Sequence, residues 1–187
     1  HLPDFPDASR ITVRQLLNHT SGISDVVPDP QPGFSRRDIT TEIRLGEIRK
    51  RPLDFAPGTD WRYSNAGYIV LGAVIERVSR QPWHVTLQRT LLDPLSLKRT
   101  RFGSDAPLVP GRVSGYTRDA NTGGVRNAVY ISMTVPDAAG ALISNVDDLL
   151  TWVRALFTGR VLTAESMRLM TMPGGTGRNH LSSTNNA

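Results

Sequence analysis

The stretch from residue 65 to residue 79, NAGYIVLGAVIERVS, places apolar side chains on more than one face of the helix that its spacing predicts. These side chains are Tyr68, Ile69, Leu71, Val74, Ile75 and Val78. A helix that is apolar on most sides is buried, so other elements must surround it. Ser64 or Asn65 can cap its N-terminus. We therefore expect a fold built around this helix, with Tyr63, Ser64 and Asn65 at its start.

Capping residues and apolar spacing predict further helices on both sides of this one. They comprise a short helix after Thr12, residues 41–50, 83–92 and 146–158, and a last helix from Thr163 to Met170. The apolar stripe of the helix after Asn145 is Leu149, Leu150, Val153, Leu156 and Phe157. Between residues 99 and 136 glycine and proline recur, so we expect loops with one or two small strands, for example within residues 125–133. The chain is predicted to be rich in helix, with little strand and long loops.

A chain of 187 residues is long enough for one domain with a sizeable core. We assign residues 1–172 to that domain and expect residues 173–187, which are small and polar, to form a flexible tail. No run approaches the roughly 18 apolar residues of a membrane-spanning helix, and the first ten residues do not resemble a signal peptide. Because the chain begins with His1 and not Met, we expect that the protein continues upstream.

The net charge and the residue composition argue against several kinds of partner, nucleophile and cofactor. The net charge of +5 comes from arginines scattered along the chain, without the dense basic stripe typical of nucleic-acid-binding proteins, so nucleic acid is not an expected partner. The chain has no cysteine, which excludes disulfides and thiolate nucleophiles. None of the four histidines stands at metal-binding spacing, and no phosphate-binding loop occurs, so we predict no metal and no cofactor.

Two short segments could take part in catalysis. His19, in the segment NHTSG, could pair with a serine, but no acidic residue is placed by the sequence to orient it, and we favour a structural role. Tyr63 could transfer a proton if cations or donors stabilised its phenolate, and Asn65 could hold a substrate amide. Tyr63 could equally be a packing residue with its hydroxyl at the surface. The residues alone leave this choice open.

Four blocks of sequence together resemble one enzyme family. They are ITVRQLLNHTSGI, PGTDWRYSNAGYIVLGAVIERVS, LLDPLSL and AAGALISNVDDLLTWVRAL, and the match extends from residue 2 to about residue 170. Their order and spacing resemble the serine penicillin-recognising enzymes, which include class C β-lactamases, D-alanyl-D-alanine carboxypeptidases and related esterases. The resemblance implies an α/β fold of the β-lactamase/DD-peptidase type. It implies that this chain covers mainly the helix-rich lobe and lacks most of the central antiparallel sheet.

The family resemblance also implies roles for two residues. These enzymes form an acyl-enzyme with three motifs: Ser-x-x-Lys, Tyr-x-Asn, and Lys-Thr-Gly or His-x-Gly. Tyr63 and Asn65 match the second motif, so Tyr63 is expected to transfer protons and Asn65 to orient the substrate. The first motif is absent, because Glu47 and Leu95 stand three places before the only lysines, Lys50 and Lys98. The third motif is absent as well.

We therefore expect the central part of a longer serine hydrolase that acts on an amide or ester, either a β-lactam, a D-Ala-D-Ala peptide or an ester. The 187 residues alone are expected to be inactive and to associate with the missing segments of the same fold. The alternative is a catalytically silent homologue that binds a peptide or a protein. A nucleic-acid binder remains a third class, which predicts steep salt dependence. From the resemblance alone, the protein is expected to be secreted or to lie in the cell envelope.

Overall fold

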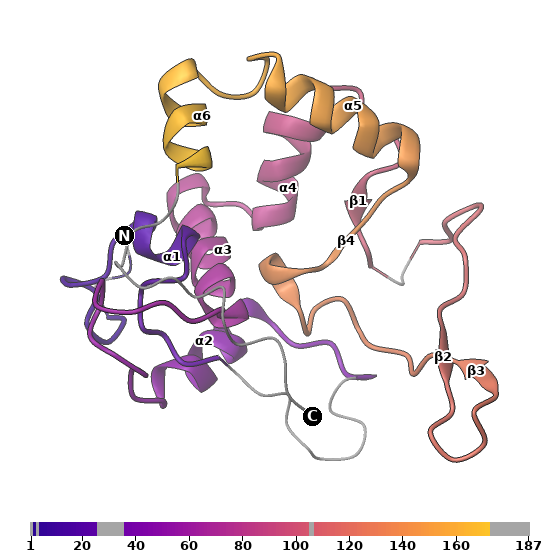
Figure 1. Ribbon diagram of the computed structural model, residues 1–187, viewed down its shortest axis with the longest axis horizontal. Coiled ribbons are helices and arrows are strands. Elements are labelled where there is room, and N and C mark those ends of the chain that lie inside the picture. The colour runs from indigo at the N-terminus through magenta and orange to yellow at the C-terminus, as the bar shows by residue number, and fades with distance from the viewer. Residues whose placement is uncertain (1, 3, 26–35, 105–106, 173–187) are drawn as a thin grey trace.

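The computed structural model describes residues 2, 4–25, 36–104 and 107–172, and helix α3 (Asn65–Ser79) lies among its other elements (Figure 1). It packs against α1 (Val13–Leu17), α2 (Thr41–Arg49), α4 (Trp83–Leu87) and the 3₁₀ helix η3 (Asp137–Ala139). The buried residues of this core are Phe5, Leu16, Ile23, Leu45, Ile48, Ala66, Ile69, Val70 and Ala73. The predicted central helix is thus confirmed.

Side-chain caps begin most of the helices where the sequence predicted. Thr12 and Gln15 form a capping box, in which the Gln15 N–H donates to Thr12 Oγ1 at 3.2 Å and the Thr12 N–H donates to Gln15 Oε1 at 2.8 Å. Asn145 accepts the Asp148 N–H at 2.9 Å through its side chain. Each of these bonds satisfies a backbone donor that the first turn of a helix leaves without an intrahelical partner.

The C-terminal helices form a second layer, drawn at the top of Figure 1. The predicted helix 83–92 is continuous but changes register, because α4 ends at Leu87 and a π-helix, η2 (Gln88–Leu92), follows it. Helix α5 (Val146–Phe157) packs Ala155 against Leu92 at the end of that π-helix and against Leu95 and Leu97 after it. Helix α6 (Ala164–Thr171) follows.

The described strands are short and form two separate antiparallel pairs. Strand β1 (Arg101–Phe102) pairs with β4 (Leu142–Ile143), with Arg101 opposite Ile143. Strand β2 (Tyr116–Arg118) pairs with β3 (Val125–Asn127) in a hairpin that projects from the helices (Figure 1). The β-prone stretch 125–133 therefore gives a strand only as far as Asn127. The described part of the chain is helix-rich with small sheets, as predicted.

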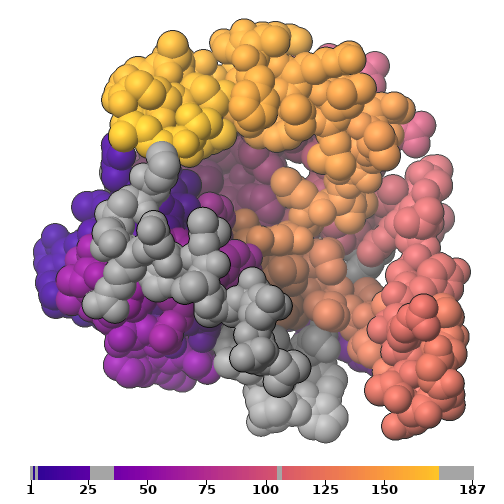
Figure 2. All heavy atoms as spheres, viewed as in Figure 1, coloured from indigo at the N-terminus to yellow at the C-terminus, as the bar shows by residue number. Residues whose placement is uncertain are grey.

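The apolar stripe of α5 is largely exposed. Leu149, Leu150, Val153 and Phe157 are 52%, 47%, 48% and 67% exposed, while Leu156 is 9% exposed. Figure 2 shows α5 and α6 as a band along one edge of the molecule. The last turns of α3 also leave Ile75 and Val78 at 40% and 63% exposure, so the expectation that this helix is buried on most sides is wrong at its C-terminal end. Exposed apolar area on this scale is typical of an interaction surface.

None of the helices in the described residues is long and apolar enough to cross a membrane. The division into a domain at 1–172 and a tail stays a prediction, because residues 173–187 lie outside the described residues.

Candidate active site

Residues Tyr63, Ser64 and Asn65 form the start of α3. Ser64 has an extended backbone, with φ −147° and ψ 114°, and its Oγ accepts the Gly67 N–H at 3.1 Å. Ser64 is therefore the N-cap, and it is buried. Asn65 is the first residue of the helix. Tyr63 precedes the cap and is 54% exposed, so its phenol is accessible from solvent.

The side chains of Tyr63 and Asn65 contact each other directly. The Tyr63 hydroxyl donates a hydrogen bond to Asn65 Oδ1 at 3.0 Å. An asparagine amide has one acceptor oxygen and two N–H donors, so this bond leaves both Nδ2 hydrogens for other partners. The two residues singled out by the sequence thus form one hydrogen-bonded unit at the N-terminus of a helix.

Asp25 is a third member of this cluster, which the sequence interpretation did not identify. Its Oδ2 accepts from Asn65 Nδ2 at 3.0 Å, and its Oδ1 accepts from the Ala66 N–H at 3.0 Å. A carboxylate is favourable at a helix N-terminus, where backbone N–H groups lack intrahelical partners and the helix dipole is positive. Asp25 stands 40 residues before Asn65, so no local spacing connects them. The sequence feature that could have identified Asp25 is an acidic residue at the end of the segment HTSGISD, which begins with His19.

His19 contacts the backbone and the aromatic rings at the start of α3. Its Nδ1 accepts the Ser64 N–H at 3.2 Å, so that nitrogen carries no proton and Nε2 carries the hydrogen. Its ring lies 4.7 Å from the Tyr63 ring and 5.3 Å from the Tyr68 ring, measured between centroids. Burial lowers the pKa of His19, while the negative charge of Asp25 acts in the opposite direction. These contacts agree with the structural role that the sequence favoured.

The loop that carries His19 is held by backbone hydrogen bonds to residues 54–62. The N–H groups of Asp54, Gly58 and Arg62 donate to the carbonyl oxygens of Gly22, Thr20 and His19 at 2.8, 2.8 and 3.1 Å. Gly22 has φ +77°, and a Cβ built on it would lie 2.1 Å from the Phe55 carbonyl oxygen. Only glycine fits here without a shift of the backbone. The HTSG block thus fixes the wall from which Asp25 and His19 reach α3.

An apolar groove of about 580 Å³ adjoins this wall. It runs between α1, α3, α4 and the segment 138–142, and its lining includes Leu17, Tyr68 and Leu71. The Tyr68 hydroxyl donates to the Leu17 carbonyl oxygen at 3.0 Å across one end of it. Because Tyr68 also contacts His19, the groove begins next to the Tyr63–Asn65 unit.

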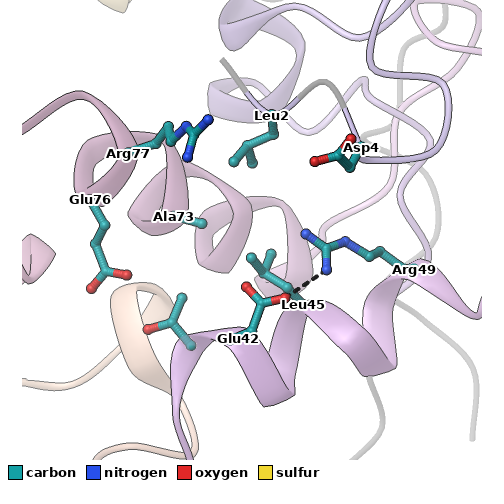
Figure 3. Close-up of a pocket in the computed structure, with 9 residues that line it drawn as sticks. Leu2, Asp4, Glu42, Leu45, Arg49, Ala73, Glu76 and Arg77 are labelled. Carbon is teal, nitrogen blue, oxygen red and sulfur yellow. Dashed lines mark hydrogen bonds and ion pairs between the residues drawn. The ribbon is translucent and has the colours of Figure 1, made fainter. Parts of the chain in front are cut away.

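A more polar cavity of about 400 Å³ lies between α2, α3 and the N-terminal segment (Figure 3). Glu42 and Arg49 form an ion pair of 2.7 Å at its edge, and Glu76 and Arg77 lie on its α3 side. Its α3 residues begin at Ala73, eight residues after Asn65. At 1.5 Å per residue this is about 12 Å further along the helix, so the cavity is separate from the candidate site. Within the described ranges, no three His, Cys, Asp or Glu side chains gather as metal ligands.

Comparisons with known proteins agree with the family resemblance. The solved structure of a D-stereospecific amidohydrolase from Streptomyces sp. superposes with a TM-score of 0.79 at 32% identity, covering 90% of this chain and 53% of that chain. Esterase EstB of Burkholderia gladioli is 31% identical over 153 residues, which are 75% of this chain and 38% of the esterase. The putative penicillin-binding protein PbpX of Bacillus subtilis (strain 168) is 25% identical over 179 residues, 93% of this chain and 42% of that protein.

The chain spans less than half the length of these two curated relatives. Two of the three relatives are hydrolases by name, one of amides and one of esters. A family model described as Beta-lactamase matches residues 1–186. The fold expected from the four sequence blocks is confirmed by the structural likeness. The chain therefore belongs to the Beta-lactamase family.

Proposed function

We propose that Tyr63 and Asn65 serve the acyl-transfer reaction of a serine hydrolase, in a longer protein that also carries a Ser-x-x-Lys motif. One observation carries this proposal: the hydroxyl of the exposed Tyr63 bonds at 3.0 Å to an asparagine amide that is itself held at the start of α3. A phenol beside an oriented amide places a proton-transfer group and a substrate-binding group within reach of one substrate.

Tyr63 and Asn65 take different parts in this reaction. The bond from the Tyr63 hydroxyl to Asn65 Oδ1 belongs to the neutral phenol and is released when Tyr63 ionises. In the phenolate form, stabilised by the cation of the motif lysine, Tyr63 accepts the proton of the serine hydroxyl. The serine oxygen bonds to the substrate carbonyl carbon, and Tyr63 returns the proton to the leaving nitrogen or oxygen as the C–N or C–O bond breaks. Water then hydrolyses the acyl-serine ester. Asn65 donates an N–H to the substrate carbonyl oxygen and so orients the acyl group.

The proposed substrates are small amides, peptides or esters, with a D-amino acid amide as the first choice. The amidohydrolase, at 32% identity over 90% of this chain, supports a D-configured amide. The esterase, at 31% identity, supports an ester. A β-lactam and a D-Ala-D-Ala peptide contain the same type of carbonyl and follow as further candidates. The proposed location, outside the cell or in its envelope, is supported by the penicillin-binding relative.

The exposed apolar side chains support association of this chain with further segments of the same fold. Leu149, Val153 and Phe157 line one such face on α5, and Leu17 and Ile75 line the groove beside α1 and α3. Covering this area removes apolar surface from water, which is favourable by about 25 cal/mol per Å². The missing parts of a β-lactamase-like domain are therefore the proposed partner.

A second candidate is a catalytically silent homologue that binds a peptide or protein. The observation that favours it is the absence of Ser-x-x-Lys from these 187 residues. The two candidates differ in the gene sequence upstream of His1, where the enzyme requires Ser-x-x-Lys.

The direct test uses a fluorescent penicillin and a chromogenic D-alanine anilide with the full-length protein and with the 187-residue chain. We expect a one-to-one covalent adduct or turnover with the full-length protein and neither with the chain alone. An adduct on the chain alone would contradict the assignment of the nucleophile to a missing segment. Binding without adduct or turnover in the full-length protein would favour the silent homologue.

A further inference from the structure

The two oxygens of the Asp25 carboxylate contact two different parts of the α3 start. Oδ1 accepts from the backbone N–H of Ala66, and Oδ2 accepts from the side-chain Nδ2 of Asn65, each at 3.0 Å. The backbone of Asp25 is held in turn, because Arg51 donates to its carbonyl oxygen at 3.2 Å. The carboxylate therefore links the fixed backbone of the helix to the movable amide of Asn65.

This link decides which way the Asn65 amide faces. Rotating the amide by 180° about its last bond would exchange Oδ1 and Nδ2. An ionised carboxylate only accepts hydrogen bonds, so Asp25 is compatible with Nδ2 facing it and repels Oδ1. With Nδ2 on Asp25, Oδ1 faces the Tyr63 hydroxyl, as observed at 3.0 Å. One N–H of Nδ2 stays available, since the amide nitrogen carries two.

Capping of the helix does not by itself account for Asp25. Ser64 already supplies the N-cap bond, from the Gly67 N–H to its Oγ at 3.1 Å. The bond from Asn65 Nδ2 to Asp25 adds the orientation of a side chain that the candidate site uses. A hydrogen bond to an ionised carboxylate is stronger than one to a neutral acceptor, so it fixes the geometry of the donor.

We propose that Asp25 is a positioning residue for acyl transfer, which sets the Asn65 amide so that one N–H of Nδ2 stays free for the substrate carbonyl, while its oxygen accepts from the Tyr63 hydroxyl only before Tyr63 ionises. This inference rests on the proposed function of Tyr63 and Asn65. Nothing in Asp25 itself contacts substrate in this account; it acts through Asn65.

The test is a double-mutant cycle for acylation by the fluorescent penicillin in the full-length protein. Asp25→Asn keeps the size of the side chain but presents a donor where only acceptors are compatible. Displacement of a reacting group by about 1 Å can cost on the order of a hundredfold in rate, so we expect Asp25→Asn to slow acylation at least tenfold. In an Asn65→Ala background the same change should have little effect, because the group that Asp25 orients is gone.

An equal loss from Asp25→Asn in both backgrounds, or no loss in the wild-type background, would overturn the proposal. Asp54→Asn is a matched control, since Asp54 is a neighbouring loop carboxylate that pairs with Arg62 at 2.8 Å and touches neither site residue in the described contacts. Acylation should be unchanged in that variant. Thermal unfolding of each variant identifies any that fail to fold.

A second readout separates this inference from the proposed function. The side-chain NH₂ signals of Asn65 in an NMR spectrum of the full-length protein report the bond to Asp25 whether or not the protein is an enzyme. In Asp25→Asn these signals should shift and exchange faster with water. If the wild-type protein forms no acyl adduct and does not turn over the D-alanine anilide, the proposed function fails. Unchanged Asn65 signals in Asp25→Asn would contradict the positioning role independently.

Discussion

The Nδ1 atom of His19 accepts the backbone N–H of Ser64 at 3.2 Å, although 45 residues separate the two in the sequence. This bond joins the loop after α1 to the N-cap residue of α3. Protonation of Nδ1 would replace the acceptor with a donor and break the bond. This link between the loop after α1 and the start of α3 is therefore expected to be sensitive to pH.

We predict that the titration of His19 lowers the free energy of unfolding as the pH falls. Burial lowers its folded-state pKa below the ordinary value of 6.5, so below that pH the unfolded chain binds a proton that the folded chain resists. The free energy of unfolding should decrease as pH falls from just above 6.5 towards the folded pKa. Asn tolerates the left-handed backbone that His19 adopts, with φ 61°, and does not titrate.

The measurement is urea unfolding of the wild type and of His19→Asn at several pH values from 8 to 5. The wild type should lose more stability over this range than the variant, whatever the difference at pH 8. Parallel pH profiles of the two proteins would show that His19 is not the titrating group.

Two helical glycines should respond in opposite directions to alanine. A Cβ on Gly72 would lie 2.5 Å from the Ala138 Cβ, where α3 packs against η3, whereas a Cβ on Gly46 in α2 meets no atom within 4 Å. Overpacking of this kind costs about 1–3 kcal/mol, so Gly72→Ala should destabilise the protein. Gly46→Ala should stabilise it by about 0.5–1 kcal/mol, because alanine is a better helix former. Chemical denaturation measures both, and destabilisation by Gly46→Ala would contradict the open surroundings of Gly46 in α2.

The negative charge of Glu76 should lower the free energy of unfolding at neutral pH, and replacing Glu76 with glutamine should remove this effect. Burial raises the pKa of Glu76, the negative charge of Asp137 adds to this, and the Trp83 N–H that donates to Oε1 at 3.1 Å opposes it. His84 also opposes the shift. The Glu76 carboxyl binds a proton more tightly in the folded state than in the unfolded state, so its ionisation at neutral pH destabilises the folded state. This destabilisation disappears as pH falls through the raised pKa to below the ordinary value of 4.5.

Glu76→Gln keeps an acceptor for the Trp83 N–H and removes the charge. At pH 7 the variant should be at least as stable as the wild type. As the pH falls towards 4.5, the stability of the wild type should rise relative to that of the variant. Glu76→Ala, which removes the acceptor as well, should be less stable than Glu76→Gln at pH 7. Equal stability of the glutamine and alanine variants in thermal melts would argue against the bond to Trp83.

Local sequence patterns predicted where the helices lie better than they predicted which residues pack against those helices. The capping box of Thr12, the cap of Asn145 and the ends of α2 depend on residues within one turn, so they could be read from the sequence. The apolar stripe of α5 was also correct as a pattern. What covers that stripe depends on distant residues, and in the structure only its Leu156 is buried.

The candidate site was predictable only in its local part. Tyr63 and Asn65 are two positions apart, and their spacing matches a family motif. Asp25 and His19 join them through a loop whose path is set by backbone bonds to residues 54–62 and by the tight approach of Gly22 to Phe55. Such contacts between distant segments leave no periodic signal. The sequence interpretation therefore selected Tyr63 and Asn65 as candidates and missed Asp25, the carboxylate that hydrogen-bonds to Asn65.

The rate of acylation of the Tyr63→Phe variant tests the central claim most directly. The substitution removes one hydroxyl from a side chain that is 54% exposed, so the fold should be retained, as thermal unfolding would verify. Proton transfer by a positioned side chain contributes typically about a hundredfold to ten-thousandfold. In the full-length protein the second-order rate constant for acylation by a fluorescent penicillin should therefore fall at least about a hundredfold. An unchanged rate constant in a folded variant would contradict the assignment of Tyr63 as the proton carrier.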